Sequence, residues 1–409
     1  MMKRVWTFVL FLFLSLCAMA SEGSASLFTP YPGQNGGQTR APFGYKPFYI
    51  SHFGRHGCRY MSSGEQVAVV LDVLEAAHQQ RLLTAEGEAL YQDFLAFDAA
   101  EDGMYGQLSE RGGIEHAGIS QRMFRHFRPV FTSRKRRIVR GISSMYPRCV
   151  LSMTHFCMEL KSRAPRLKMD LSAGVKYYKR LNTPDSTRAL VEIRSRGEAY
   201  LNPHFPSFFE DTAFFGRVFK DPAAARGLCK DWTAFYMRLY DCICNVDCVG
   251  LDIGLKRYLT EEEFGGLMHF RNCIIFAEDG RNPLNWDARK PLVRVFLKEM
   301  LDKADEAVAG NEVAADLRFG HDSGLSGLMS LIGVAGYDVE SDPADAWKVW
   351  DAAEMMPMAS NMQWVFYRSR FKKKILVKIL FNEKETSIPA LGPGPYYQWT
   401  DLRAYLMSL

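Results

Sequence analysis

The sequence predicts an α/β fold with a mostly helical second lobe. Apolar, strand-like runs alternate with stretches of helical periodicity in residues 47–164 and again in 291–409, as in a sheet covered by helices. Between these ranges, residues 165–290 contain several helix-like segments and few convincing strands. The chain has 409 residues, more than one ordinary domain, so a core with a large insertion is expected.

The first 46 residues precede this core. A short basic start is followed by an apolar run over 5–16 and by the sequence Ala-Met-Ala at 18–20. This order is typical of a secretory signal peptide, which we place at 1–20, and the apolar run is short for a membrane span. Residues 21–46 are rich in Gly, Pro and Ser and predict an extended lead-in. We therefore expect an exported protein, either periplasmic or extracellular.

The first half of the core should begin with a strand that ends in a turn. Its helices are predicted from apolar spacing, and Ser109 is a candidate N-cap residue. In order, the expected elements are a strand over 46–53, helices within 64–100 and over 108–128, a strand over 137–143 and a helix over 148–160.

The range 165–290 is expected to form the helical lobe, with helices over 187–202, 222–245 and 260–275. Its dense aromatic residues predict core packing rather than a stacking platform for a ligand. These residues are Phe205, Phe208, Phe209, Phe214, Phe215, Trp232, Phe235 and Tyr236. The α/β alternation then returns with helices over 291–309, 325–332 and 401–406 and strands over 315–320, 362–367 and 375–381.

The charge balance limits the partners to expect. The net charge is +5, and it falls to +3 when Lys3 and Arg4 leave with the signal peptide. A nearly balanced chain without a basic tail argues against a nucleic-acid binder, and any positive field should be local to a site for an anionic substrate. No later stretch is apolar enough to span a bilayer, so stable membrane insertion is not expected. The oligomeric state stays open.

Eight cysteines remain after removal of the signal peptide, an even number that permits disulfides in an exported protein. Four lie within 229–248, where a local bridge fits the short spacing, whereas Cys58 and Cys149 lie in candidate active-site segments and are expected to be free. The spacing Cys-x-Cys-x-x-x-Cys does not match a zinc site, and no histidine lies near it. The sequence therefore predicts neither a metal site nor a cofactor. The eight are Cys58, Cys149, Cys157, Cys229, Cys242, Cys244, Cys248 and Cys273.

The segment 49–60, YISHFGRHGCRY, carries the first functional motif. A strand-like run delivers Arg55, His56 and Arg59 into a turn, with Gly57 allowing close approach of the backbone to a ligand. Guanidinium forks match the oxygens of a phosphate group, and an imidazole held among them can attack phosphorus. The segment is therefore interpreted as a phosphate pocket that contains its own nucleophile.

The segment 317–323, LRFGHDS, carries the second motif. A predicted strand ends at Gly320, and His321 and Asp322 follow on the strand-to-helix turn. Ligands of α/β sheets bind beyond the carboxyl ends of strands, so this position suits a site. A carboxyl group can protonate a leaving alkoxide, and an imidazole can hydrogen-bond the oxygens of a phosphoryl group.

Together these segments resemble the signatures of the histidine phosphatase superfamily, in its branch of histidine acid phosphatases and phytases. The resemblance implies a phosphoglycerate-mutase-like three-layer sandwich and hydrolysis of phosphate esters through a covalent phosphohistidine, without a metal. It implies that His56 is the nucleophile and Asp322 the general acid. It also implies that the phosphate is held by Arg55, Arg59 and His321.

A third segment, 143–152, resembles the family's mid-chain segment, in which an arginine at a helix start completes the phosphate pocket. On that match Arg148 is the third guanidinium, and a helix N-terminus adds free N–H groups for an anion. The neighbouring basic run 134–137 is the alternative, and we interpret it as solvated surface.

The substrate is less defined because the motifs are mixed between subfamilies. Tyr60 resembles the multiple inositol polyphosphate phosphatases, whereas Met61 stands where many phytases have proline. His321-Asp322-Ser323 stands where the former usually have His-Ala-Glu. We expect inositol polyphosphates as substrates; the alternatives are a general acid phosphatase for small phosphomonoesters and a phosphate-binding protein without turnover.

Other phosphatase chemistries do not fit the sequence. A cysteine phosphatase requires Arg six residues after its Cys, but that position holds Gly64 after Cys58 and His155 after Cys149. The nine histidines are scattered, and the Gly-x-Ser-x-Gly motif of serine hydrolases is absent.

Overall fold

A computed structural model of the chain describes residues 27–33, 37–182 and 187–409. The signal peptide predicted over 1–20 lies outside these described residues. Over the ranges that are described, no helix combines the length and apolar character needed to cross a bilayer.

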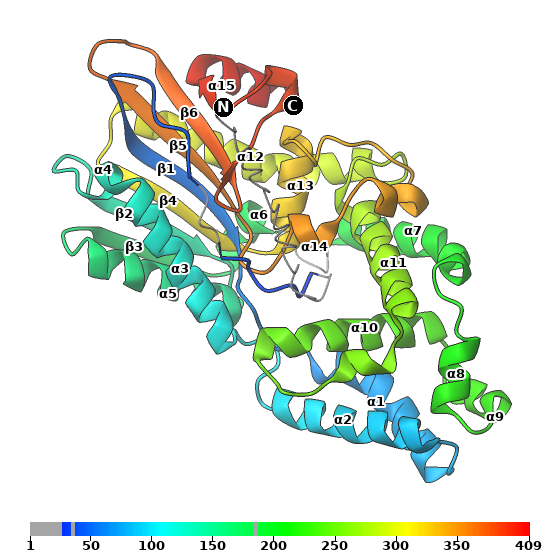
Figure 1. Cartoon of the computed structure of the whole chain (residues 1–409). Helices are drawn as coiled ribbons and strands as arrows, with labels where there is room; N and C mark the ends of the chain where they lie inside the picture. The colour runs from blue at the N-terminus through cyan, green and yellow to red at the C-terminus, as the bar shows by residue number, and fades with distance from the viewer. Residues whose placement is uncertain (1–26, 34–36, 183–186) are drawn as a thin grey trace, which may run out of the picture.

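One mixed eight-stranded sheet forms the centre of the molecule (Figure 1). The strand order is β3-β2-β4-β1-β5-β6-β7, and β8 pairs with β6. β1 to β4 run parallel, whereas β5 and β6 run antiparallel to their neighbours. The strands are β1 (Tyr45–Arg55), β2 (Ile138–Ser143), β3 (Lys168–Ala173), β4 (Val313–Gly320), β5 (Asn361–Ser369), β6 (Ile375–Phe381), β7 (Lys384–Glu385) and β8 (Tyr396–Gln398).

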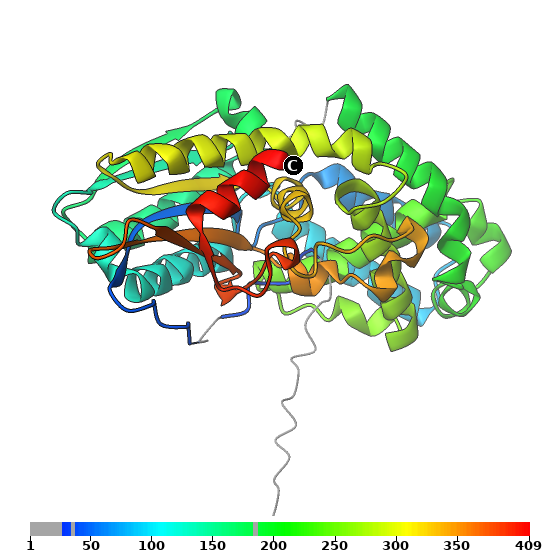
Figure 2. The same cartoon turned by 90° about the horizontal axis from the view of Figure 1, so that it is seen from above.

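Helices cover both faces of the sheet, which confirms the predicted three-layer α/β sandwich. One face packs on α3 (Glu110–His126), α4 (Arg128–Phe131) and α5 (Pro147–Arg163). The other face packs on α12 (Trp286–Ala309), α13 (Asp322–Ile332) and α15 (Trp399–Ser408). Viewed from above, α12 and α3 lie on opposite sides of the sheet (Figure 2). β4 is buried along its whole length because both faces are covered.

The remaining long helices share a second apolar core beside the sheet. The predicted packing role of the aromatic residues is confirmed, because all eight are buried in this core or packed against it. The helices of this part are α1 (Gly64–Gln79), α2 (Ala85–Glu101), α7 (Arg188–Leu201), α8 (Thr212–Val218), α9 (Pro222–Arg226), α10 (Trp232–Val249) and α11 (Glu261–Asp279). Short helices elsewhere are α6 (Tyr178–Leu181), α14 (Ala352–Met355) and the 3-10 turns Val175–Tyr177, Asn202–Ser207, Leu255–Tyr258, Pro343–Lys348 and Pro389–Leu391.

Three elements, β3, α1 and α2, lie on the other side of the expected lobe boundaries. β3 falls inside 165–290 but pairs with β2 in the sheet. It is an edge strand with no buried residue, so its sequence carries little apolar alternation. Conversely, α1 and α2 fall inside 47–164 but pack on the helical side, with Val67, Val70 and Leu74 in the second core. An amphipathic stripe predicts that a helix is buried, but not against which partner.

Local expectations for helix ends are met in part: the N-cap of α3 is as predicted, whereas the helix expected over 222–245 is two helices, α9 and α10. The Ser109 side chain accepts a hydrogen bond from the Gly112 N–H at 3.3 Å and caps α3, as predicted. α13 begins at Asp322 and α12 at Trp286, each several residues before the predicted start.

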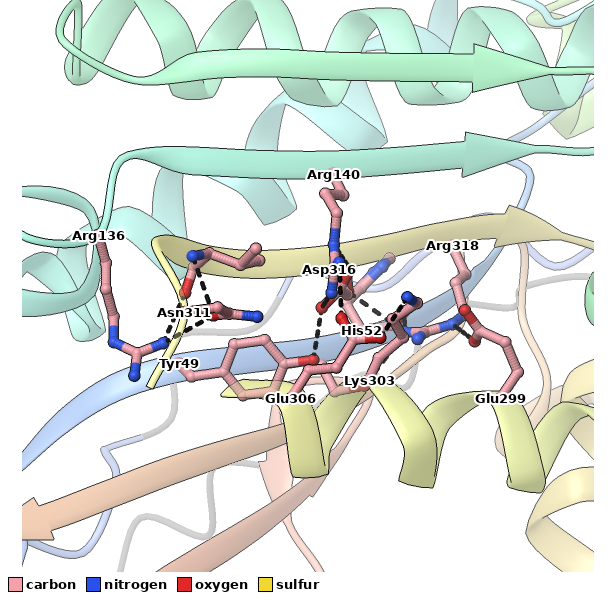
Figure 3. A network of polar contacts seen from close by, with 12 residues as sticks. Tyr49, His52, Arg136, Arg140, Glu299, Lys303, Glu306, Asn311, Asp316 and Arg318 are labelled. Atoms are coloured by element: carbon pink, nitrogen blue, oxygen red, sulfur yellow. Dashed lines mark hydrogen bonds and ion pairs between the residues drawn. The ribbon is translucent and has the colours of Figure 1, made fainter. Parts of the chain in front are cut away.

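A buried polar network joins the sheet to α12 (Figure 3). On β4, Asp316 accepts hydrogen bonds from Arg140 Nε at 2.6 Å and from the Tyr49 hydroxyl at 2.7 Å. Arg318, two residues further on, donates to Glu299 of α12 at 2.5 Å. These buried polar groups are paired with one another, so their burial carries little penalty. Their hydrogen bonds link β1, β2 and β4 to α12 and so hold the ends of these strands in place.

All eight cysteines of the described part are free, which confirms the expectation for Cys58 and Cys149. The local bridge expected within 229–248 is wrong. Cys242, Cys244 and Cys248 lie on the single helix α10. Helical neighbours keep Cβ atoms about 5–6 Å apart at best, whereas a disulfide needs about 3.5–4.5 Å.

Candidate active site

The three predicted motif segments meet where three adjacent parallel strands end. β4 lies between β2 and β1, with Arg55 opposite Gly320 and Ser143 opposite Phe319. The His56 N–H donates to the Gly320 carbonyl at 3.0 Å. Segments far apart in the chain therefore deliver their side chains to one edge of the sheet, the usual place for a ligand in such folds.

His56 is buried at this edge with its nucleophilic nitrogen defined by geometry. Its Nδ1 lies 2.9 Å from the Gly57 carbonyl oxygen, which can only accept, so Nδ1 carries the proton and Nε2 keeps its lone pair. Burial lowers the pKa of His56 well below its ordinary value, and the charges of Arg148, Arg55 and Arg59 lower it further. The ring is thus held neutral, the state required of a nucleophile.

The turn that carries His56 is packed directly on the first turn of α3. A Cβ on Gly57 would lie 2.6 Å from the Gly112 carbonyl oxygen, and one on Gly112 would lie 2.3 Å from that of Cys58. The Cys58 N–H donates to the buried Glu115 carboxylate at 2.8 Å. Two glycines and one carboxylate therefore set the position of the turn.

Arg55 lies beneath the cleft and bridges two parts of the site. It is 1 % exposed; Nη1 donates to the Met356 carbonyl at 2.7 Å, and Nη2 lies 3.2 Å from an Asp322 carboxylate oxygen. Its contact with Asp322 joins the first motif to the second, a pairing that the sequence does not reveal.

Arg59 and Arg148 line the cleft beside His56. Arg148 stacks on the Tyr146 ring at 4.5 Å, and the Nε of each arginine is buried without a hydrogen-bond partner among the residues described. Burial and the nearby Arg148 and Arg55 lower the pKa of Arg59 to about 10. Crowding cations in this way costs free energy unless an anion enters among them.

His321 and Asp322 lie beside His56 in the wall of the cleft. The rings of His321 and His56 have centroids 5.6 Å apart, and His321 Nε2 lies 3.0 Å from the Ser144 hydroxyl. Burial and Arg148 lower the pKa of His321 to about 3, so it is neutral. Burial alone would raise the pKa of Asp322, but Arg55, His321 and Arg59 lower it to about 2.

The cleft itself has a volume of about 250 Å³ and is lined from both sides. The sheet side contributes His56, Arg59, Arg148, His321 and Asp322. Of the six predicted site residues, only Arg55 is not in the wall, because it lies behind Asp322. Each predicted role stays a prediction, but the structure brings all six residues together.

Sequence reasoning missed the wall contributed by the helical part. Arg194 of α7 donates to Glu278 of α11 at 2.8 Å, and Arg271 pairs with Asp241 at 2.6 Å. Asp279 at the end of α11 pairs with the fully buried Arg289 at 2.8 Å. These residues occur singly within ordinary amphipathic helices, so no motif marks them. In the residues described, no group of three or more His, Cys, Asp or Glu side chains could hold a metal ion.

Comparison with solved structures shows where this architecture has been seen. The multiple inositol polyphosphate phosphatase of Bifidobacterium longum, in its complex with phosphate, superposes with a TM-score of 0.77 at 18 % identity, covering 94 % of this chain and 97 % of that one. Its complex with inositol hexasulfate gives a TM-score of 0.73 at 18 % identity and the same coverage. The phytase from D. castellii gives 0.67 at 14 % identity, covering 94 % of this chain and 84 % of that one.

No protein-family model and no curated protein sequence matches the chain. At these low identities the structural likeness establishes the fold alone. The chain has the mixed α/β fold of these phosphatases over nearly its whole length, including the helical part.

Proposed function

We propose that this chain is a secreted phosphomonoesterase of the histidine acid phosphatase branch, acting on inositol polyphosphates through a covalent phosphohistidine. One observation carries the proposal: a neutral His56 with a free Nε2 lines a pocket together with Arg59, Arg148 and Asp322, and Arg55 pairs with Asp322 from behind this wall. The fold shared with an inositol polyphosphate phosphatase and with phytases supports it, and so does the signal-peptide-like start of the sequence.

In the first step, His56 Nε2 attacks phosphorus as the bond to the leaving oxygen breaks. Arg55, Arg59 and Arg148 neutralise the phosphoryl oxygens, and His321 adds a hydrogen bond as charge develops. Three cations can do here what a metal ion does in other phosphatases. Water then attacks the phosphohistidine, which releases phosphate and restores the neutral imidazole.

The leaving alkoxide needs a proton, and Asp322 is placed to supply it. In the free protein Asp322 is ionised, because Arg55 pairs with it. A bound phosphate dianion would compete for Arg55 and bring negative charge near the carboxylate, and both effects raise the pKa of Asp322. Activity should therefore be greatest at acid pH, and a rate that rises steadily into alkaline pH would contradict this assignment.

The test is phosphate release from inositol hexakisphosphate and from p-nitrophenyl phosphate at pH 4 to 7, without added metal. Wild type should hydrolyse both, His56→Ala should hydrolyse neither, and the ratio would separate a phytase-like enzyme from a general acid phosphatase. The matched control is His204→Ala, because His204 is an exposed histidine of the helical part. If wild type is inactive, or if His56→Ala keeps its activity, the nucleophile assignment fails and a phosphate-binding role takes its place.

A further inference from the structure

Two phenylalanines project from the end of the sheet that lies away from the cleft. Phe43 is 93 % exposed and Phe371 is 76 % exposed, and their rings stack with centroids 6.4 Å apart. Phe43 lies just before β1, and Phe371 lies in the turn between β5 and β6. The pairing of Tyr45 with Ser369 brings the two segments together. A stacked aromatic pair left this open to water marks an interaction surface.

Cations surround this pair. The turn that holds Phe371 carries four exposed basic residues, and none of them forms an ion pair with any residue that the structure describes. They are Arg370, Lys372, Lys373 and Lys374. Further exposed cations precede β2 and β3 at the same end of the sheet, namely Arg134, Lys135, Arg137 and Arg166, with Lys168 opening β3.

A shared aromatic side chain joins the two groups of cations. The Phe48 ring lies between the guanidiniums of Arg136, at 4.9 Å, and Arg368, at 4.5 Å. Arg136 continues the run before β2, and Arg368 leads into the β5–β6 turn. The cations therefore belong to one continuous end of the sheet rather than to scattered loops.

The direction of β1 separates this surface from the cleft. β1 begins at Tyr45 beside the phenylalanines and ends at Arg55 in the candidate active site. A strand of 11 residues spans about 35 Å, so the two lie at opposite ends of the sheet. Figure 1 shows the β5–β6 turn at the end of the sheet remote from the helical part. A body bound at the turn would leave the cleft open.

We propose that Phe43, Phe371 and the cations of residues 370–374, hereafter the aromatic–basic tip, attach this protein to the surface of a membrane rich in anionic phospholipid. The phenylalanines would enter the boundary between headgroups and acyl chains, and the cations would pair with lipid phosphates. Two mostly exposed phenylalanines beside these cations suit a lipid surface, which offers both acyl chains and phosphates, better than a small soluble anion. This inference is independent of the proposed function.

The test measures how much protein sediments with phospholipid vesicles. One set of vesicles contains phosphatidylcholine alone, and the other also contains about 30 % phosphatidylglycerol, an anionic phospholipid. Protein recovered after export should bind only the anionic vesicles, and salt should weaken the binding. The triple variant Lys372→Ser, Lys373→Ser, Lys374→Ser should weaken binding about 100-fold, from roughly fivefold per lysine. Phe43→Ser with Phe371→Ser should weaken it at least tenfold, and both variants should keep phosphatase activity.

Two matched controls separate the tip from general charge and hydrophobicity. Lys220→Ser, Lys230→Ser and Arg294→Ser together remove three exposed cations elsewhere that form no ion pair with a described residue, and Ile114→Ser with Met158→Ser removes two apolar side chains exposed by 65 % and 67 %. Neither should change binding by more than about twofold. Equal binding to neutral vesicles, equal loss in the controls, or full competition by soluble inositol hexasulfate would overturn the proposal.

Discussion

Replacing Gly112 by alanine tests how tightly the candidate nucleophile is positioned. Gly112 lies in the first turn of α3, where a Cβ would meet the Cys58 carbonyl oxygen at 2.3 Å and the Cys58 nitrogen at 2.8 Å. Both atoms are backbone of the turn that carries His56, so no side-chain rotation relieves the clash.

The size of the effect follows from these distances. Ordinary contact begins near 3.4 Å, so the turn must move by about 1.1 Å. A displacement of about 1 Å at reacting groups costs on the order of 100-fold in rate. The clash of the added methyl group should lower the free energy of unfolding by about 1–3 kcal/mol. Because alanine has a higher helix propensity than glycine, up to about 1 kcal/mol of this loss is offset. Gly112→Ala should thus lose activity far more than stability.

The assay compares kcat/KM for p-nitrophenyl phosphate with the free energy of unfolding in urea. The control is Gly265→Ala in α11, where an added Cβ would meet no described atom within 4 Å apart from the backbone of its own helix. This variant should raise the free energy of unfolding by up to about 1 kcal/mol and leave the rate unchanged. If Gly112→Ala keeps its rate within about threefold while remaining folded, the two-glycine contact does not position the nucleophile, and the reasoning fails.

Three further predictions follow from single contacts. Asp322→Asn should lower kcat about 10²–10⁴-fold for inositol phosphates but far less for p-nitrophenyl phosphate, whose leaving group needs no proton; equal losses would argue against a proton donor. Burial lowers the pKa of His116 to about 3. Below about pH 6.5 this histidine is therefore protonated in the unfolded chain but neutral in the folded protein, so the free energy of unfolding falls as the pH drops. His116→Phe should reduce that fall by up to about 1.4 kcal/mol per pH unit between pH 6 and 4, measured by urea unfolding, and an unchanged slope would contradict it. Arg318→Leu should cost up to about 3–5 kcal/mol by leaving Glu299, whose side chain is only 12 % exposed, without its ion-pair partner, and adding Glu299→Leu should restore most of it; a double variant no more stable than the single one would refute this.

Much of the secondary structure could be predicted because its determinants are local. β1 and β4 are rich in apolar residues and are predicted as strands, and α3 starts after the predicted cap Ser109. β3 escaped prediction because an exposed edge strand needs few apolar residues. The expected disulfide within 229–248 failed for a related reason, since spacing along the chain does not show that three of the four cysteines share one helix.

The sequence by itself determined which chemistry the candidate site could contain. One strand ends with Arg55 and is followed by His56 and Arg59, and another is followed by His321 and Asp322. Reactive groups at the carboxyl end of a strand can form a ligand site in any sheet that exposes that end. Short-range patterns of this kind need no knowledge of long-range pairing.

Only the tertiary structure decided how those groups act on one another. Sheet order places β4 between β1 and β2, which brings Asp322 to Arg55 and lowers its pKa. Helix packing selects Arg194 and Glu278 for the cleft wall, and the pairing of β1 with β5 brings Phe43 to a basic turn. The physical reason is common to all three: contacts between segments far apart in the chain depend on strand order and helix packing, which local sequence patterns do not encode.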